Sequence, residues 1–215
     1  MVKFVIVRHG YSVTNKTQTF AGHLDVDLDD IGYEQAEDVK DFIVNNYKVD
    51  AIYSSDLKRA YETARPTADA LGLEIVTDTA LRELYVGRWQ GMTTSDVAEK
   101  FPESFNVFKT NVGKSRPDGG ETYTELSERA DRAFRKIALQ NDGKTVMVVT
   151  HGGLIRALRC LWNGYCVTTA QSIPHVPNAS VTIVEYDNGK FDFVEVGLSS
   201  HLRSLSSKKD IKSLF

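Results

Sequence analysis

Apolar and polar residues alternate along this chain in segments that predict short buried strands separated by helices. Two mainly apolar runs, 3–7 and 145–150, end abruptly in polar residues, as central strands of a parallel sheet do. After Asp29, a good helix N-cap, apolar residues fall on one side of a helix that extends to Ile43. Strands and helices in this order predict an α/β fold, a three-layer αβα sandwich around a mostly parallel sheet.

Capping and turn residues mark the bounds of the other elements. A Ser-Ser-Asp sequence caps a helix that Gly72 ends, and Pro66 predicts a kink or a second helical start within it. Thr122 and Glu125 have the spacing of a capping box and open another helix. The full set of further elements comprises strands at 51–53 and 73–76 and helices at 57–71, 94–101, 103–110, 122–140 and 154–162.

The last part of the chain predicts a β-hairpin followed by a tail. Segments 181–186 and 191–196 are expected to be strands, because Asn188 and Gly189 between them supply the positive φ angles of a tight I′ turn. Residues 199–215 are rich in Ser and Lys and predict a loosely ordered polar tail. No repeat or linker divides the chain, so we expect one domain over 1–198, followed by this tail.

The overall charge is nearly balanced. The chain has 215 residues, of which 26 are basic and 29 acidic, giving a net charge of −3. We therefore expect no nucleic-acid or membrane partner, and the apolar runs are far shorter than the roughly 18 residues of a membrane span. No export signal is visible, and Cys160 and Cys166 are expected to be reduced thiols. We predict a cytoplasmic protein, a monomer or a homodimer.

Two histidines follow the predicted central strands at matching positions. The strand at 3–7 runs into Arg8 and His9, and the strand at 145–150 runs into His151. Because ligands of open α/β sheets bind beyond the carboxyl ends of the strands, we expect both imidazoles over one crevice. A lone histidine is more often a structural hydrogen-bonding residue, but two at matching positions favour a site.

Two arginines and a glutamate add charge to this crevice. Arg8 adjoins His9 at a strand end, and Arg59 lies one or two turns into the helix after the 51–53 strand. Two guanidinium groups suit a tetrahedral oxyanion such as phosphate, although Arg59 alone is equally well explained as a surface charge. Glu83 lies in a loop where a carboxyl partly withdrawn from water can act as a general acid, although alone it suggests an ordinary exposed glutamate.

A metal site is the competing interpretation of the histidines. The five histidines include no H-x-H or H-x-x-x-H pair. Two arginines and a second imidazole also provide the positive charge that a metal ion would otherwise bring. We therefore expect no metal and no cofactor.

The residues singled out so far fall within longer motifs that occur in a fixed order along the chain. In this sequence the motif residues are Arg8, His9, Gly10, Ser12 and Asn15; Asp25, Leu28, Gly32, Gln35 and Ala36; Ser55, Leu57, Arg59, Ala60, Thr63 and Ala64; Leu81, Glu83, Gly87, Trp89 and Gly91; Gly119, Gly120, Glu121 and Thr122; and Thr150, His151, Gly152 and Gly153. Together they fall within residues 4–155 and resemble the histidine phosphatase superfamily, the phosphoglycerate-mutase-like proteins. The resemblance is closest to its broad-specificity phosphatase branch.

The resemblance implies a catalytic role for five residues by their positions in the motifs. His9 would be the nucleophile that forms a phosphohistidine. Arg8, Arg59 and His151 would surround the oxygens of the transferred phosphoryl group. Glu83 would protonate the departing alkoxide and then help a water molecule attack the phosphoenzyme.

The resemblance also suggests how the substrate is held. The family usually has Glu or Gln where this chain has Tyr11, which would border the substrate mouth and favour larger or apolar leaving groups, or would simply pack. Loops 18–25, 84–120 and 172–178 are expected to form the pocket walls. The residues expected to bind substrate are Asn15, Tyr11, Gly22, His23, Gly152 and Asn178.

Among the functions open to such a chain, we favour a phosphomonoester hydrolase that acts on small phosphorylated metabolites through a phosphohistidine. A cofactor-dependent phosphoglycerate mutase needs extra basic residues, whereas residues 84–87 after Glu83 include apolar ones and the basic residues of 92–120 are scattered. A catalytically silent phosphate-binding protein is the remaining alternative. The presence of both His9 and Glu83 argues against it.

Overall fold

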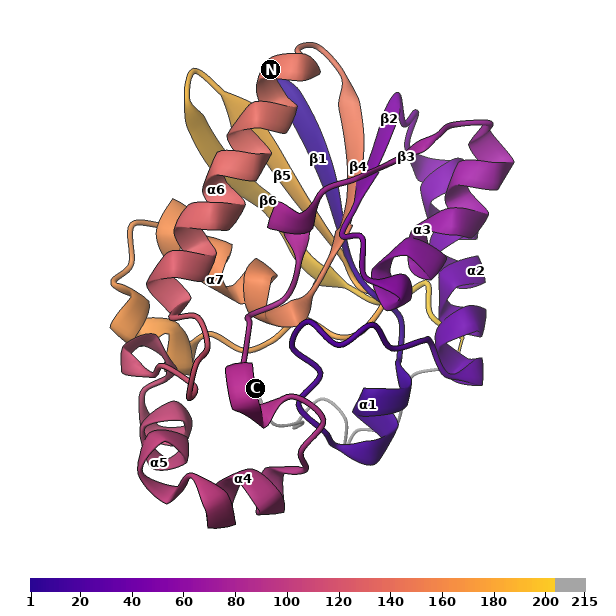
Figure 1. Cartoon of the computed structure of the whole chain (residues 1–215). Helices are drawn as coiled ribbons and strands as arrows, with labels where there is room; N and C mark the ends of the chain where they lie inside the picture. Colours follow the sequence, from indigo (N-terminus) through magenta and orange to yellow (C-terminus); the bar gives the residue numbers. More distant parts are fainter. Residues whose placement is uncertain (204–215) are drawn as a thin grey trace.

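A six-stranded sheet lies between two layers of helices in the computed structural model, which describes residues 1–203 (Figure 1). The sheet has the order β3-β2-β4-β1-β5-β6. Its first four strands pair in parallel, whereas β5 pairs antiparallel with both β1 and β6. The strands are β1 (Val2–Arg8), β2 (Ala51–Ser54), β3 (Ile75–Thr77), β4 (Thr145–Thr150), β5 (Val181–Asp187) and β6 (Lys190–Leu198). The predicted α/β fold, with a mostly parallel sheet and a C-terminal hairpin, is confirmed.

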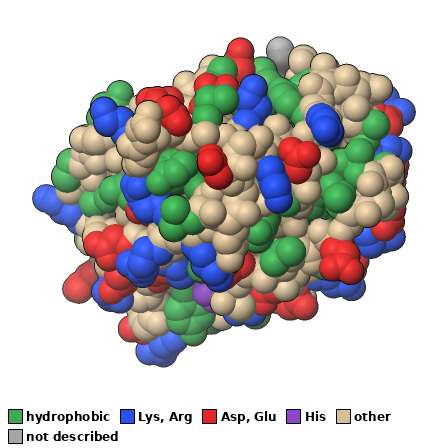
Figure 2. Space-filling model, turned by 90° about the horizontal axis from the view of Figure 1, so that it is seen from above, with side chains coloured by type: hydrophobic (Ala, Val, Ile, Leu, Met, Phe, Trp, Pro, Cys, Tyr) green, Lys and Arg blue, Asp and Glu red, His purple; other side chains and the backbone are tan. Residues whose placement is uncertain are grey.

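The helices cover both faces of this sheet. Figure 1 shows α2 and α3 on one face, α6 and α7 on the other, and α4 and α5 beyond one end of the strands. The helices are α1 (Val13–Thr17), α2 (Asp30–Asn46), α3 (Lys58–Leu71), α4 (Thr94–Lys100), α5 (Pro102–Thr110), α6 (Tyr123–Gln140) and α7 (Gly152–Trp162). Acidic and basic side chains are interspersed on the face that Figure 2 shows.

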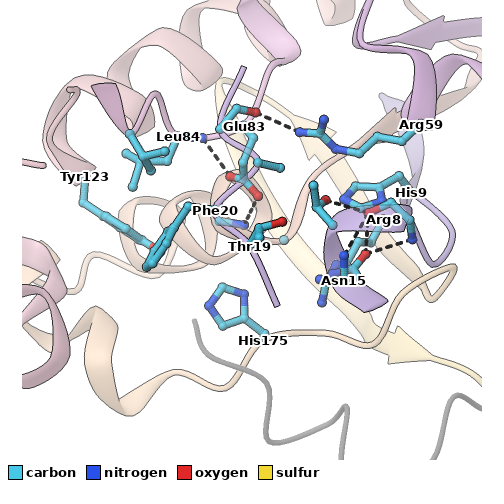
Figure 3. Close-up of a pocket in the computed structure, with 17 residues that line it drawn as sticks. Arg8, His9, Asn15, Thr19, Phe20, Arg59, Glu83, Leu84, Tyr123 and His175 are labelled. Atoms are coloured by element: carbon cyan, nitrogen blue, oxygen red, sulfur yellow. Dashed lines mark hydrogen bonds between the residues drawn. The ribbon is translucent and has the colours of Figure 1, made fainter. Parts of the chain in front are cut away.

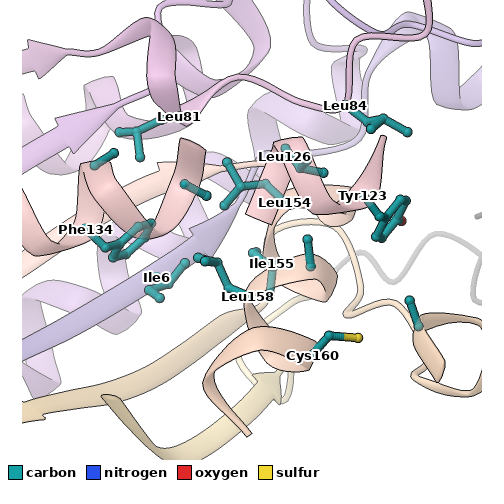
Figure 4. Close-up of a cluster of buried hydrophobic side chains, with 14 of the residues drawn as sticks. Ile6, Leu81, Leu84, Tyr123, Leu126, Phe134, Leu154, Ile155, Leu158 and Cys160 are labelled. Carbon is teal, nitrogen blue, oxygen red and sulfur yellow. The ribbon is translucent and has the colours of Figure 1, made fainter. Parts of the chain in front are cut away.

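Alternate residues of β1 divide the core into two clusters. Phe4 and Ile6 pack on the side of α6 and α7, whereas Val5 and Val7 pack on the side of α2 and α3. All four side chains are buried, as expected for a strand covered on both faces. Figure 4 shows Ile6 within the cluster on the side of α6 and α7. This burial fixes the strand's register, because a shift by one residue would exchange the two faces.

Local signals account for several of the observed helix ends. The side chain of Asp29 caps α2, and Thr122 and Glu125 form the expected capping box of α6. Gly72 ends α3 with a φ of 65°, in the left-handed region that glycine adopts readily. One expectation is wrong: α3 begins after Leu57 without a side-chain cap.

Two further features differ in detail from the sequence-based expectations. Helix α3 continues through Pro66 as a single helix, so no second helix starts there. Strand β3 begins at Ile75, because its pairing with β2 starts opposite Ile52. The hairpin turn has the expected geometry, with φ values of 48° at Asn188 and 84° at Gly189.

The residues after β6 lie against α2. Leu202 is buried, and both the backbone N–H and the guanidinium of Arg203 donate to Asp38. Most of the predicted tail lies outside residues 1–203, so the division of the chain at residue 198 stays a prediction. Within the same range, no helix has the length and apolarity needed to cross a bilayer. Cys160 and Cys166 are both unpaired.

Candidate active site

A pocket opens at the carboxyl ends of the parallel strands, where the register of the sheet brings two predicted site residues together. Arg8 of β1 is paired with Thr150 of β4, so His9 and His151 leave the sheet side by side. Figure 3 shows His9, Arg8, Arg59 and Glu83 around this pocket. Its lining residues are Arg8, His9, Ser12, Thr14, Asn15, Thr19, Phe20, Ala21, Gly22, Arg59, Glu83, Leu84, Val86, Tyr123, Gly152, Gly153 and His175.

His9 presents one unprotonated ring nitrogen for chemistry. Its Nδ1 lies 2.7 Å from the carbonyl oxygen of Gly10, which can only accept, so in the neutral ring Nδ1 carries the proton and Nε2 the lone pair. Burial, together with the positive charges of Arg59 and Arg8, holds the pKa of His9 well below its usual range. The ring is therefore neutral at pH 7, and the lone pair of Nε2 is the kind of group that a nucleophilic step requires.

His151 lies next to this ring but is not among the residues that line the pocket. The two imidazole centroids are 5.1 Å apart, and His151 is completely buried. Burial and the charge of Arg59 also lower its pKa well below the usual range. Neither of its ring nitrogens has a hydrogen-bond partner among residues 1–203. Buried polar atoms are normally paired, so these nitrogens suit a ligand that enters the site.

The two arginines carry positive charge close to Glu83 but form no ion pair with it. Arg59 is fully buried and donates to the backbone oxygens of Gly22 and Leu24, both at 2.9 Å, and Arg8 donates to the oxygen of Val176 at 2.7 Å. Burial lowers the pKa of each to about 10, so both remain charged at pH 7. Within the described part of the chain neither forms a salt bridge, and the buried Nε of each has no partner.

Backbone groups hold the carboxylate of Glu83. Its Oε1 accepts the N–H of Leu84 at 2.8 Å, and its Oε2 accepts the N–H of Gly153 at 3.0 Å. Gly153 lies in the first turn of α7, where the absence of a side chain matters. A Cβ on Gly153 would lie 2.4 Å from Oε1 of Glu83. The glycine therefore allows the carboxylate to approach the helix.

The rest of the pocket is mostly apolar. Phe20, Leu84, Val86 and Tyr123 form a wall beside the charged end, and each is at most 5% exposed. Tyr123 and Leu84 also belong to the core cluster seen in Figure 4, so this wall continues into the protein interior. His175 completes the lining, and its Nε2 lies 2.9 Å from the Arg156 guanidinium.

The residues predicted to bind substrate divide into two groups. Asn15, Gly22 and Gly152 line the pocket. The residues outside its lining are Tyr11, His23 and Asn178. The side-chain amide of Asn178 donates to the backbone oxygen of His9 at 3.0 Å and to Oδ1 of Asn15 at 3.3 Å, so it contacts two residues that line the pocket.

His23 and Tyr11 contact other parts of the structure. The ring of His23 lies against that of Tyr85, and its Nε2 lies 2.8 Å from the backbone oxygen of Glu83. The backbone N–H of Tyr11 donates to Gln35 at 2.8 Å.

Sequence reasoning missed the residues that form the apolar wall. Loops 18–25, 84–120 and 172–178 were expected to supply the walls, and Phe20, Leu84 and His175 come from them. The sequence shows that Phe20 and Leu84 are apolar, but apolar loop residues usually pack in the core, as Trp89 does here. Nothing in their spacing showed which would face a pocket. Within residues 1–203, no cluster of three or more His, Cys, Asp or Glu side chains could hold a metal ion.

Comparison with known proteins agrees with this geometry. Residues 4–199 match the model of the histidine phosphatase superfamily (branch 1), so the chain belongs to this superfamily. Over 203 residues it is 36% identical to phosphoglycerate mutase-like protein 4 of Arabidopsis thaliana, with 93% of this chain and 86% of the relative covered. It is 33% identical over 207 residues to a metal-independent phosphoserine phosphatase of the same plant, with coverages of 95% and 85%.

A solved structure extends the comparison to the fold. YhfR of Bacillus stearothermophilus superimposes with a TM-score of 0.90 at 29% identity, and the match covers 94% of this chain and 100% of that protein. The predictions of family and of a phosphatase enzyme are therefore confirmed. The protein is a histidine phosphatase.

Proposed function

We propose that His9, Arg8, Arg59, His151 and Glu83 are the catalytic residues with which this phosphatase hydrolyses small phosphomonoesters. The observation that carries the proposal is the pair of charged guanidiniums beside a neutral His9, neither joined to a carboxylate within residues 1–203. A buried charge without an ion-pair partner is costly. A phosphate dianion supplies the missing negative charge and accepts hydrogen bonds from the unpaired donors.

The first chemical step transfers the phosphoryl group to His9. Nε2 of His9 forms a bond to phosphorus while the ester P–O bond breaks, and the departing oxygen takes a proton from the carboxyl group of Glu83. Arg8, Arg59 and His151 hold the three phosphoryl oxygens, whose charge is spread in the transition state.

The second step returns the enzyme to its starting state. A water molecule attacks phosphorus on the side that the alcohol has left, and the carboxylate of Glu83 takes the proton of that water. The P–N bond breaks, which frees inorganic phosphate and neutral His9. The two steps therefore balance as one ester and one water converted to one alcohol and one phosphate.

The pocket supports a hydrolase rather than a mutase. A mutase must hold a second phosphate or a carboxylate beside the transferred group. The only Lys or Arg residues among the pocket-lining residues of the described chain are Arg8 and Arg59, and both lie at the His9 end. The Arg156 guanidinium lies 6.0 Å from the centroid of the Tyr123 ring in the apolar wall but is not among the residues that line the pocket.

This wall also bears on the leaving group. It offers apolar surface, and among the described residues that line the pocket it contributes no Lys or Arg, so esters of uncharged or aromatic alcohols fit it better than esters that carry a carboxylate. The names of some relatives indicate substrates that do carry a carboxylate. They include phosphoserine phosphatases and a glucosyl-3-phosphoglycerate phosphatase from Mycolicibacterium vanbaalenii, 32% identical over 185 residues. Phosphoserine is therefore the second candidate substrate.

A phosphoester panel in excess chelator tests the proposal. We expect turnover of phenyl phosphate that survives chelation and disappears in His9→Ala, with a higher kcat/KM than for phosphoserine. A higher kcat/KM for phosphoserine would overturn the leaving-group proposal but leave the catalytic residues in place. Turnover that persists in His9→Ala would overturn the catalytic assignment. Conversion of 3-phosphoglycerate to 2-phosphoglycerate faster than to phosphate would show a mutase.

A further inference from the structure

One of the sequence motifs has no part in the mechanism above. It comprises Gly119, Gly120, Glu121 and Thr122, which precede α6 and do not line the pocket. The carboxylate of Glu121 nevertheless forms a bidentate ion pair with the guanidinium of Arg129, with both N···O distances 2.9 Å. The two side chains are only 14% and 20% exposed, which makes this pair stronger than a surface salt bridge.

The other donors of Arg129 reach the segment that carries Glu83. The guanidinium donates to the backbone oxygens of Ala80 at 2.7 Å, Arg82 at 3.0 Å and Glu83 at 3.2 Å. This segment belongs to no strand, so its carbonyl groups have no sheet neighbour to bond to. Arg129 therefore supplies hydrogen bonds that regular structure would otherwise provide.

Glu121 holds the same segment on the far side of Glu83. Its Oε2 accepts the backbone N–H of Tyr85 at 3.2 Å, and its own backbone N–H donates to the oxygen of Tyr85 at 2.8 Å. Glu83 thus lies between Arg82, whose backbone oxygen is hydrogen-bonded to Arg129, and Tyr85, whose backbone is hydrogen-bonded to Glu121. The backbone oxygen of Glu83 is also 2.8 Å from Nε2 of His23.

We propose that Arg129 and Glu121 are positioning residues that hold the backbone of residues 80–85 so that the Glu83 carboxyl reaches the leaving-group oxygen. This inference rests on the proposed role of Glu83 as general acid. Neither residue touches the pocket, so neither is a catalytic residue. The effect can be large, because misplacing a reacting group by about 1 Å can reduce the rate roughly 100-fold.

The leaving group distinguishes positioning from general support of the fold. An alkyl phosphate needs a proton from Glu83 as its alkoxide departs, whereas the acidic phenol of p-nitrophenyl phosphate departs without one. We expect Arg129→Met to lower kcat/KM for an alkyl phosphate by about 10- to 100-fold and for p-nitrophenyl phosphate by less than about threefold. Arg132→Met, on the exposed side of the same helix, is the matched control and should change neither.

Glu121→Gln provides a second, milder test, because it keeps the size of the side chain. The fall in kcat/KM of Glu121→Gln should show the same dependence on the leaving group. In the double variant of Arg129→Met and Glu121→Gln, the fold-decrease in kcat/KM should be smaller than the product of the two single fold-decreases, since both residues act through one ion pair. Each variant is first checked for a thermal unfolding transition. If Arg129→Met does not fold, Glu121→Gln alone decides.

The outcomes separate this inference from the proposed function. Equal losses on both esters, or no loss, in a folded variant of an active enzyme would overturn the positioning role. If Glu83→Gln instead turns over the alkyl phosphate as fast as the wild-type enzyme does, Glu83 has no role in the mechanism. A selective loss on the alkyl ester in Arg129→Met and Glu121→Gln supports the inference.

Discussion

The imidazole rings of His9 and His151 lie 5.1 Å apart, although the two residues come from distant parts of the chain. They meet because β1 and β4 are parallel neighbours whose last residues, Arg8 and Thr150, are paired. Each histidine is the first residue beyond its strand. The sheet therefore places a second buried ring beside that of His9, near the two arginines that carry the site's positive charge.

Removing the acidic proton of Glu83 is expected to slow chemistry and leave phosphate binding intact. Glu83→Gln keeps the size of the side chain but cannot donate a proton to the alkoxide, so kcat for an alkyl phosphate should fall about 100-fold or more. Steady-state kinetics measure this, and the inhibition constant of inorganic phosphate should stay within a few fold. Glu74→Gln, at an exposed position, is the control. Unchanged turnover in Glu83→Gln would contradict the assignment.

Gly153→Ala should act through Glu83. The added Cβ would lie 2.4 Å from Oε1 of Glu83, so the carboxylate must move. Because the atom displaced is the end of a flexible side chain, we expect the fold to persist while alkyl-phosphate turnover falls about tenfold or more. Gly164→Ala would place its Cβ in open space, although at a φ of 69°, and controls for the loss of a glycine. Full activity in Gly153→Ala would show that Glu83 has room to reposition productively.

Inorganic phosphate should stabilise the folded protein through the unpaired arginines. A ligand at 100 times its Kd adds about 2.7 kcal/mol to the free energy of unfolding, which a thermal shift assay detects. Arg59→Met should abolish most of this shift, because it removes one of the two buried guanidiniums. Arg65→Met, at an exposed position on the same helix, should retain it. An unaltered phosphate-induced shift in Arg59→Met would place the anion elsewhere.

Acid should destabilise the ligand-free protein before its carboxylates titrate. Burial and nearby arginines hold the pKa values of His9, His151 and His175 well below 6.5. These residues bind fewer protons folded than unfolded, so stability is fully present above the unfolded value and falls below it. Each contributes a loss of up to about 1.4 kcal/mol per pH unit below about 6.5.

Urea unfolding between about pH 7.5 and about pH 5.5 measures this loss. The slope should be shallower in His151→Asn, because an amide does not titrate. If the free energy of unfolding stays constant over this range, protonation of His9, His151 and His175 does not destabilise the folded protein.

Much of the fold follows from local patterns. The strand at 145–150, the capping box of Thr122 and the hairpin turn at Asn188 and Gly189 depend on residues close together in the sequence, and the structure shows all three. The start of α3 was harder to predict. The residue at its N-cap is Leu57, whose own side chain forms no cap. The Leu57 N–H donates to Ser55, and the Lys58 N–H donates to Asp25 from a distant loop.

The sequence by itself determined which chemistry-bearing residues follow the strands, because strand ends and motif spacing are local properties of the chain. It placed His9, Arg8 and Arg59 at one edge of the sheet, and the family resemblance added Glu83; the structure brings these four together. Only the tertiary structure decided that Phe20 faces this pocket while Tyr11 does not, and that Arg129 holds the backbone of Glu83. These contacts join segments far apart in the sequence, and the direction of each side chain depends on how those segments pack.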